Sequence, residues 1–136
     1  MAVEMRAEAR EELSCVAWHG PSGAVVETDA PADNQGRGAA FSPTDLLGAA
    51  FATCALTTMG IKGPASGIEF TTGKARVLKH MSAEPPRRIA ELEVEFELPA
   101  AHTSDERAEL ERIAQNCPVA LSLHPNTTLN VTFRYV

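Results

Sequence analysis

Aromatic residues are scarce in this chain of 136 residues: they make up 5% of it, with one Trp and one Tyr. A core must therefore be built mainly from aliphatic side chains, and a hydrophobic content of 44% is sufficient for one. Basic charge is also in short supply, since 12 Lys and Arg stand against 18 Asp and Glu, a formal net charge of −6. Nucleic-acid binders need a concentrated basic surface to release counterions, so we expect no nucleic-acid partner.

Long uninterrupted apolar runs are missing too. The longest apolar-leaning stretch, residues 46–61, contains three threonines and is shorter than the roughly 20 residues that a membrane span requires. The first residues are charged and include no apolar signal region, which predicts a cytoplasmic protein with no membrane partner. The length predicts one domain over residues 1–136, with residues 1–10 loosely attached.

Only three cysteines are present, Cys15, Cys54 and Cys117. A sparse, odd set does not fit a secreted disulfide scaffold, and the absence of Cys-x-x-Cys excludes a thioredoxin-type motif. The four histidines are scattered, and none has the spacing of a metal ligand, so we predict no metal site. Any chemistry is therefore expected from individual thiols.

Periodicity and turn residues predict the order of the elements. The expected elements are a hairpin over residues 13–28, a loop over 29–40, a helix from 42 to about 61, strands over 70–79, 89–98 and 128–136, and a second helix over 103–115. This order is not a regular β-α repeat. It predicts an α+β fold in which an antiparallel sheet wraps around a buried helix.

The first helix has a clear start, because Ser42 can cap it, Pro43 suits its first position and Asp45 places a carboxylate in its first turn. The residues that follow are apolar on nearly all sides and mostly small. Such a helix needs cover on every side, which is more than one chain of this size readily supplies. We therefore expect a homodimer.

Two cysteines are candidates for chemistry. Cys54 lies well inside the apolar helix, and Cys117 directly precedes Pro118 in a segment that resembles a helix N-terminus, where N–H groups stabilise a thiolate. One interpretation is that both are buried small hydrophobes. The other is that they meet in space, one as a nucleophile and one resolving its sulfenic acid. Cys15, on a predicted strand, is interpreted as a core residue.

Two segments, residues 41–63 and residues 116–125, resemble the OsmC/Ohr family, the osmotically induced and organic hydroperoxide resistance proteins. The matching positions are Pro43, Asp45, Leu46, Ala49, Ala50, Cys54, Cys117, Pro118 and Val119. The resemblance implies an OsmC-like α+β fold, with antiparallel sheets wrapped around two central helices in an intertwined homodimer.

The resemblance also implies a metal-independent, two-cysteine peroxidase that acts on organic hydroperoxides. Cys54 would attack the O–O bond and become a sulfenic acid, and Cys117 would condense with it to a disulfide. No bound cofactor is implied, because an external dithiol, a dihydrolipoyl group in the hydroperoxide branch, would reduce that disulfide. The alternative is an OsmC-like stress protein that binds a small ligand or senses redox state without catalysis.

The chain departs from the hydroperoxide branch at two positions. That branch pairs its reactive cysteine with an Arg from the N-terminal hairpin and a Glu directly after the helix proline. Here the hairpin turn has no Arg, and Thr44 takes the Glu position, with Asp45 one residue later, a rotation of about 100° on a helix. Asp45 is therefore either a site carboxylate or a first-turn cap. Arg37 is the nearest basic candidate to activate Cys54, the alternative being a solvated loop arginine.

Overall fold

The computed structural model describes residues 1–136. They form two compact units, Met1–Leu46 and Leu47–Val136, which are described separately. Two helices and two three-stranded sheets make up the fold, so the α+β class is confirmed.

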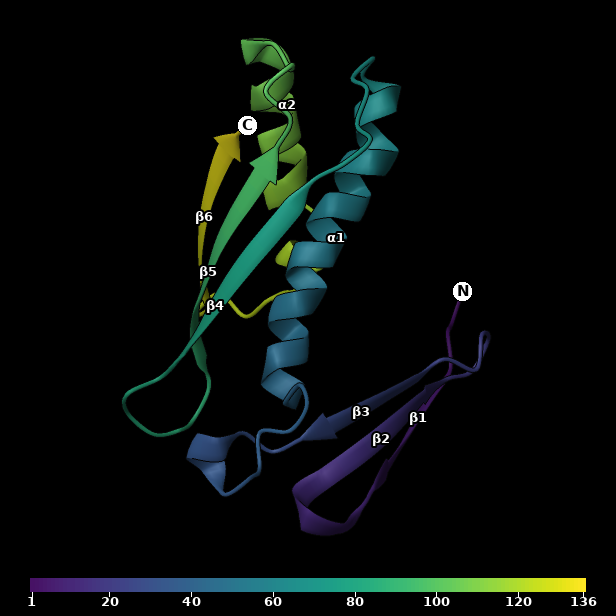
Figure 1. Cartoon of the computed structure of the whole chain (residues 1–136), viewed down its shortest axis with the longest axis vertical. Coiled ribbons are helices and arrows are strands. Elements are labelled where there is room, and N and C mark those ends of the chain that lie inside the picture. The colour runs from purple at the N-terminus through teal and green to yellow at the C-terminus, as the bar shows by residue number, and fades with distance from the viewer. The chain divides into compact units, whose positions relative to one another are not determined.

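The unit Met1–Leu46 contains one antiparallel sheet in the order β1-β2-β3 (Figure 1). Its strands are β1 (Met5–Ala9), β2 (Ser14–His19) and β3 (Val25–Asp29). The predicted hairpin is confirmed as β2 and β3. Strand β1 lies within the residues that we predicted to be loosely attached, and it pairs with β2 along its whole length.

A tight loop follows β3 and includes a short 3-10 turn, Ala32–Asn34. Gly36 is required there, because a Cβ atom at this position would lie 1.8 Å from the carbonyl oxygen of Ala30. The backbone N–H groups of Gly36 and Gly38 are held by the carbonyl oxygens of Pro31 and Ala30. This packing gives the long predicted loop, which ends just before the first helix, a defined path.

The unit Leu47–Val136 has a sheet in the order β4-β5-β6, formed by β4 (Lys74–Met81), β5 (Ile89–Leu98) and β6 (Thr128–Tyr135). Strands β4 and β5 are antiparallel, but β6 pairs with β5 in parallel. The prediction of a wholly antiparallel sheet is therefore wrong for β6. A parallel pair needs a crossover connection, which the long segment between β5 and β6 supplies through helix α2 (Ser104–Gln115).

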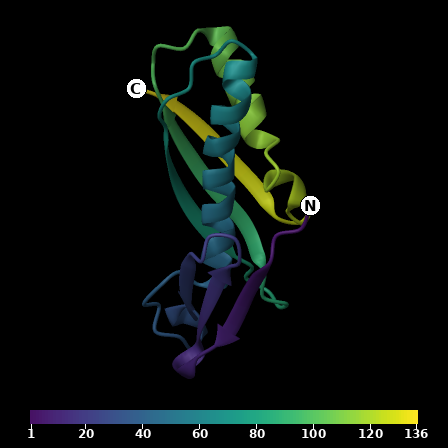
Figure 2. The same ribbon diagram turned by 90° about the vertical axis from the view of Figure 1, so that its right-hand side faces the viewer.

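Helices α1 (Pro43–Ala65) and α2 lie on the same face of this sheet (Figures 1 and 2). The first turn of α1 belongs to the other unit, and the rest packs on the sheet through one stripe of residues. Close approach depends on Gly48, because a Cβ there would lie 3.3 Å from Val77 and 3.5 Å from Leu92. The predicted capping box of α2 is confirmed: Thr103 and Glu106 each bond the other's backbone N–H.

The core of this unit is centred on Phe96 of β5. Its ring stacks on Phe133 of β6 with centroids 5.3 Å apart, and meets the edge of Phe51 of α1 at 6.1 Å. Offset stacked and edge-to-face pairs are the favoured aromatic geometries. With so few aromatic residues, the chain concentrates three of its five Phe residues at the junction of helix and sheet.

Helix α1 has 23 residues, so it is longer than the sequence predicted and is sufficient in length and composition to cross a membrane. The same properties are typical of the core helix of a globular domain. In this chain its buried residues face the core, and a third of its most apolar window is buried. Large apolar side chains of the helix outside that stripe, Leu47 and Ile61, are exposed.

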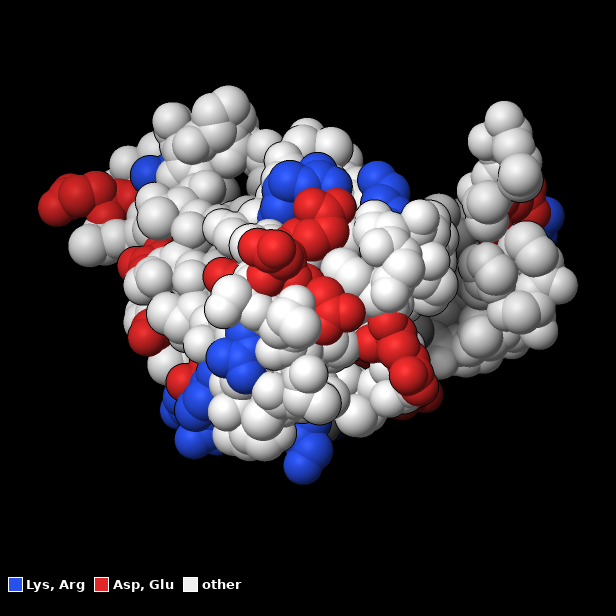
Figure 3. Space-filling model, turned by 90° about the horizontal axis from the view of Figure 1, so that it is seen from above, with Lys and Arg blue, Asp and Glu red and all other residues white.

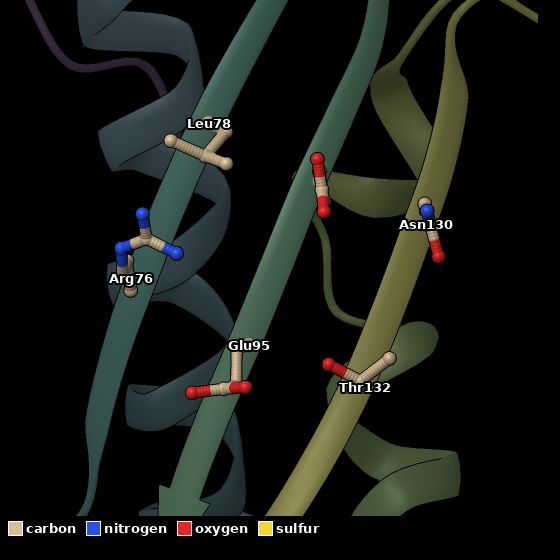
Figure 4. A pocket seen from close by; sticks show the side chains of 6 residues that line it. Arg76, Leu78, Glu95, Asn130 and Thr132 are labelled. Atoms are coloured by element: carbon tan, nitrogen blue, oxygen red, sulfur yellow. The ribbon is translucent and has the colours of Figure 1, made fainter.

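The other face of the sheet is polar. A row of four Glu residues on β5 points outward, as the alternating sequence predicts, and basic residues of the neighbouring strands lie opposite them. Glu95 faces Arg76 in the register, and Arg134 of β6 pairs with Glu97. Figure 4 shows a shallow hollow on this face, lined by Arg76, Leu78, Glu93, Glu95, Asn130 and Thr132. Figure 3 shows basic and acidic atoms side by side on the face in view.

Candidate active site

The structure brings Cys54 and Cys117 together. Cys54 lies in the middle of α1, and Cys117 lies in the connection between α2 and a short 3-10 turn, Ala120–Ser122. Their side chains lie close enough to interact electrostatically, and Cys54 packs against the core that contains Cys117 in the unit Leu47–Val136. Two neighbouring thiols can form a disulfide through a sulfenic acid on one of them.

The two thiols differ in exposure. Cys54 is partly exposed, whereas Cys117 is fully buried, with 0% of its surface accessible. Of the two residues, only Cys54 therefore has surface that a small molecule from solution can reach. This difference in exposure suits Cys54 to the role of attacking cysteine and Cys117 to the role of resolving cysteine.

The end of α2 positions Cys117. Asn116 closes the helix, because its backbone N–H donates to Ile113 O at 3.3 Å and its side-chain Nδ2 donates to Arg112 O at 2.8 Å. Pro118 follows, and the next turn is secured by the N–H of Leu121, which donates to Cys117 O at 3.1 Å. The chain thus reverses at Cys117 with its backbone held on both sides.

Burial raises the pKa of the Cys117 thiol, and the hydrogen bond and charge of Cys54 raise it further. The N–H groups of Ala120 and Val119 act in the opposite direction, as expected near the start of a helical turn. The predicted effect of these N–H groups is therefore present, but burial outweighs it and the pKa of Cys117 is raised. Cys117 therefore keeps its proton at neutral pH.

Sequence analysis missed Thr58, which lies one helical turn after Cys54 and is buried. Its Oγ1 donates to the Cys54 carbonyl oxygen at 2.7 Å and lies 3.8 Å from the Cys54 sulfur. The spacing of four residues on a predicted helix could have indicated this neighbour. Cys15 is half-buried on β2, opposite Thr28, in the other unit.

Asp45 caps the first helix. Its Oδ2 accepts a hydrogen bond from the N–H of Ser42 at 2.9 Å, and its own N–H donates to Ser42 Oγ at 3.1 Å. This reciprocal pair is a capping box with Asp in place of Glu. The cap interpretation is confirmed, and a part for Asp45 in catalysis stays a prediction.

Arg37 is held by two carboxylates rather than free in solvent. Its Nη1 lies 2.9 Å from Glu12, and its Nε lies 3.3 Å from Asp29, whose side chain is 2% exposed. The same oxygen of Asp29, Oδ2, also accepts a hydrogen bond from the N–H of Ala39 at 3.1 Å. The other oxygen, Oδ1, is buried and has no hydrogen-bond partner. Arg37 belongs to the unit Met1–Leu46 and Cys54 to the unit Leu47–Val136, so the activation of Cys54 by Arg37 stays a prediction.

Replacement of Arg37 by Ala is expected to lower the free energy of unfolding by about 1–3 kcal/mol, because the buried Asp29 carboxylate loses a charged partner. Urea denaturation measures the change. Arg6→Ala is the matched control: it removes an exposed Arg from a surface pair with Glu4, and we expect a loss of less than about 1 kcal/mol. Equal losses of stability in the two variants would contradict this interpretation. A separate measurement, the alkylation rate of Cys54, tests the predicted activation: slower alkylation in folded Arg37→Ala would confirm it.

The comparisons with known proteins agree with this geometry. The OsmC-like protein family model matches residues 35–132. A Psychrobacter arcticus protein named for osmotic stress induction and a detoxification response is 36% identical, with a TM-score of 0.88 over 96% of this chain and 94% of that chain. No curated protein matches this chain.

More distant solved structures share the fold. An organic hydroperoxide resistance protein of Legionella pneumophila is 14% identical, with a TM-score of 0.80 over 98% of this chain and 97% of that chain. An organic hydroperoxide resistance protein of Vibrio cholerae with captopril bound in one of its active sites is also 14% identical, with a TM-score of 0.76 over 98% and 92%. With the family model covering most of its length, the chain belongs to the OsmC-like protein family.

Proposed function

We propose that the protein is a thiol-dependent peroxidase that reduces organic hydroperoxides through Cys54 and Cys117. The observation that carries the proposal is the contact between a partly exposed thiol and a fully buried one that keeps its proton. Family membership supports it, because structures with this fold include proteins named for organic hydroperoxide resistance. The name of the Psychrobacter relative supports a stress or detoxification role.

The first step is an attack by the Cys54 thiolate on the terminal oxygen of the hydroperoxide. A sulfur–oxygen bond forms and the O–O bond breaks, and the electron pair leaves with the alkoxide, which takes a proton and departs as the alcohol. The sulfur of Cys54 is oxidised by two electrons to a sulfenic acid. Because Cys117 retains its proton, its S–H can donate to the Cys54 thiolate before the attack.

In the second step the sulfur of Cys117 attacks the sulfur of Cys54. A disulfide forms, the sulfur–oxygen bond breaks, and the hydroxide leaves as water with the proton of Cys117. The interaction between the two side chains supports this step, because it places the thiols near one another. An external dithiol of the dihydrolipoyl kind then reduces the disulfide and becomes a disulfide itself. The two electrons are thus carried by sulfur, and the reaction requires no resident cofactor. We propose that it takes place in a reducing compartment such as the cytoplasm.

Consumption of cumene hydroperoxide by the reduced protein, with dihydrolipoamide in excess, tests the proposed activity. We expect catalytic turnover that depends on both the hydroperoxide and the dithiol. Folded protein that consumes no hydroperoxide would contradict the proposal and favour the alternative, a ligand-binding or redox-sensing role.

We also propose that the protein is a homodimer. Helix α1 buries a single stripe, while other large apolar side chains in the unit Leu47–Val136 remain exposed, among them Ile61 at 69% and Leu121 at 72%. Exposed apolar surface of this kind is typical of an interface. On size exclusion with light scattering at micromolar concentration, we expect a mass twice the 14.5 kDa of the chain. A monodisperse monomer would contradict the proposal.

A further inference from the structure

Thr58 places a buried hydroxyl beside the reactive sulfur. Its Oγ1 lies 3.8 Å from Cys54 Sγ, within hydrogen-bond range for sulfur, and 2.7 Å from the Cys54 carbonyl oxygen, to which it donates. The residue is 7% exposed. The hydroxyl is therefore positioned between two acceptor atoms of the same cysteine.

A threonine hydroxyl has one proton to donate and two lone pairs that accept. While Cys54 is a neutral thiol, its S–H can donate to Oγ1 and the hydroxyl proton can remain on the Cys54 carbonyl. Once Cys54 ionises, the sulfur has no proton and becomes a charged acceptor. Hydrogen bonds to a charged acceptor are about twice as strong as those between neutral groups, so the hydroxyl proton is then better placed on sulfur.

We propose that Thr58 is a second hydrogen-bond donor to the Cys54 thiolate, beside Cys117, and that its hydroxyl turns from the carbonyl to the sulfur when Cys54 ionises. The inference rests on the proposed function in taking Cys54 as the attacking thiolate. It gives the buried side of that thiolate two donors, one from α1 and one from the segment after α2.

The test is the pH dependence of Cys54 alkylation by iodoacetamide in Thr58→Val, a change that keeps the shape of the side chain and removes the hydroxyl. We expect the pH midpoint of alkylation to rise by about one unit, a tenfold change in the thiolate equilibrium, because one charge-assisted hydrogen bond is lost. The rate at high pH should not fall, since a more basic thiolate is an intrinsically better nucleophile. Mass spectrometry of the peptide that contains Cys54 separates it from the other two cysteines.

Three further variants make the result specific. Thr58→Ser restores the hydroxyl and is expected to keep the wild-type midpoint. Thr58→Ala removes the hydroxyl and does not add the methyl group that Val puts in its place. Its pH midpoint should equal that of Thr58→Val, so a packing defect in one of the two variants does not decide the outcome. Thr53→Val removes a hydroxyl that makes the same kind of backbone bond, to Ala49 O at 2.8 Å, on an exposed part of α1, and should have no effect.

A wild-type midpoint in both folded Thr58→Val and folded Thr58→Ala would overturn the proposal. The hydroxyl would then serve only to satisfy its own backbone bond. Because alkylation needs no hydroperoxide, this result is independent of whether the protein is a peroxidase. A failure of peroxide turnover with the predicted midpoint shift would contradict the proposed function and leave the role of Thr58 intact.

Discussion

Cys54→Ser is expected to abolish the consumption of organic hydroperoxide, with a loss of at least about three orders of magnitude in rate. A serine hydroxyl keeps its proton at neutral pH and has no oxidation state equivalent to a sulfenic acid, so neither step can begin. The measurement is the rate of cumene hydroperoxide consumption with dihydrolipoamide as reductant. Both variant and wild type are compared at equal concentration after their fold is checked by circular dichroism.

The other two cysteines provide the controls for this variant. Cys15→Ser removes a half-buried thiol on β2, in the unit Met1–Leu46, and should retain the wild-type rate. Cys117→Ser should retain the first oxidation but lose disulfide formation, because the proposed resolving thiol is removed. Turnover at the wild-type rate by Cys54→Ser would show that the nucleophile is elsewhere.

Phe96→Ala is expected to reduce the free energy of unfolding by about 3–5 kcal/mol, the largest stability effect that we predict. The side chain is fully buried and joins α1 and β6 to β5 through its contacts with Phe51 and Phe133. Its removal leaves a cavity in the core that also contains Cys117. Urea denaturation at a fixed protein concentration, which a dimer requires, measures the change.

Leu78→Ala is the matched control for Phe96→Ala. Leu78 is on β4, but its side chain is on the polar face of the same sheet, beside Arg76 (Figure 4). It is 37% exposed, so we expect a loss of less than about 1 kcal/mol. Losses of equal size in the two variants would contradict the placement of the core at Phe96.

Much of the fold could be predicted from local patterns. The alternation of apolar and acidic residues predicts β5, and the Thr103 and Glu106 spacing predicts the start of α2. These signals depend on neighbouring residues only. The direction of β6 could not be obtained in this way, because a strand has the same alternation whether it pairs in parallel or antiparallel.

The end of α1 was predicted too early because its glycines were interpreted as stop signals. Gly63 lies inside the helix, where a Cβ would come within 3.4 Å of Ile68 O and 3.6 Å of Leu110 Cδ2. These are ordinary contact distances, so Gly63 is accommodated within the helix and does not act as a stop signal. Local sequence does not distinguish these two uses of glycine, because the distinction depends on what lies against the helix.

The candidate site was predictable only in part. Cys54 and Cys117 are far apart in sequence, and their pairing followed from the resemblance to the OsmC/Ohr family rather than from spacing. The pKa of Cys117 depends on the balance of burial against nearby N–H groups, which only the folded structure supplies. The ion pair of Arg37 with the buried Asp29 is likewise seen only in the folded structure, because no sequence pattern links the two residues.

The most direct test of the account is a count of free thiols before and after one equivalent of cumene hydroperoxide, followed by mapping of the oxidised peptides. The account predicts the loss of two thiols per chain and a disulfide between Cys54 and Cys117. It also predicts a single lost thiol and a sulfenic acid on Cys54 in the Cys117→Ser variant. An unchanged thiol count in folded, reduced protein, or a disulfide that involves Cys15, would contradict the proposed mechanism.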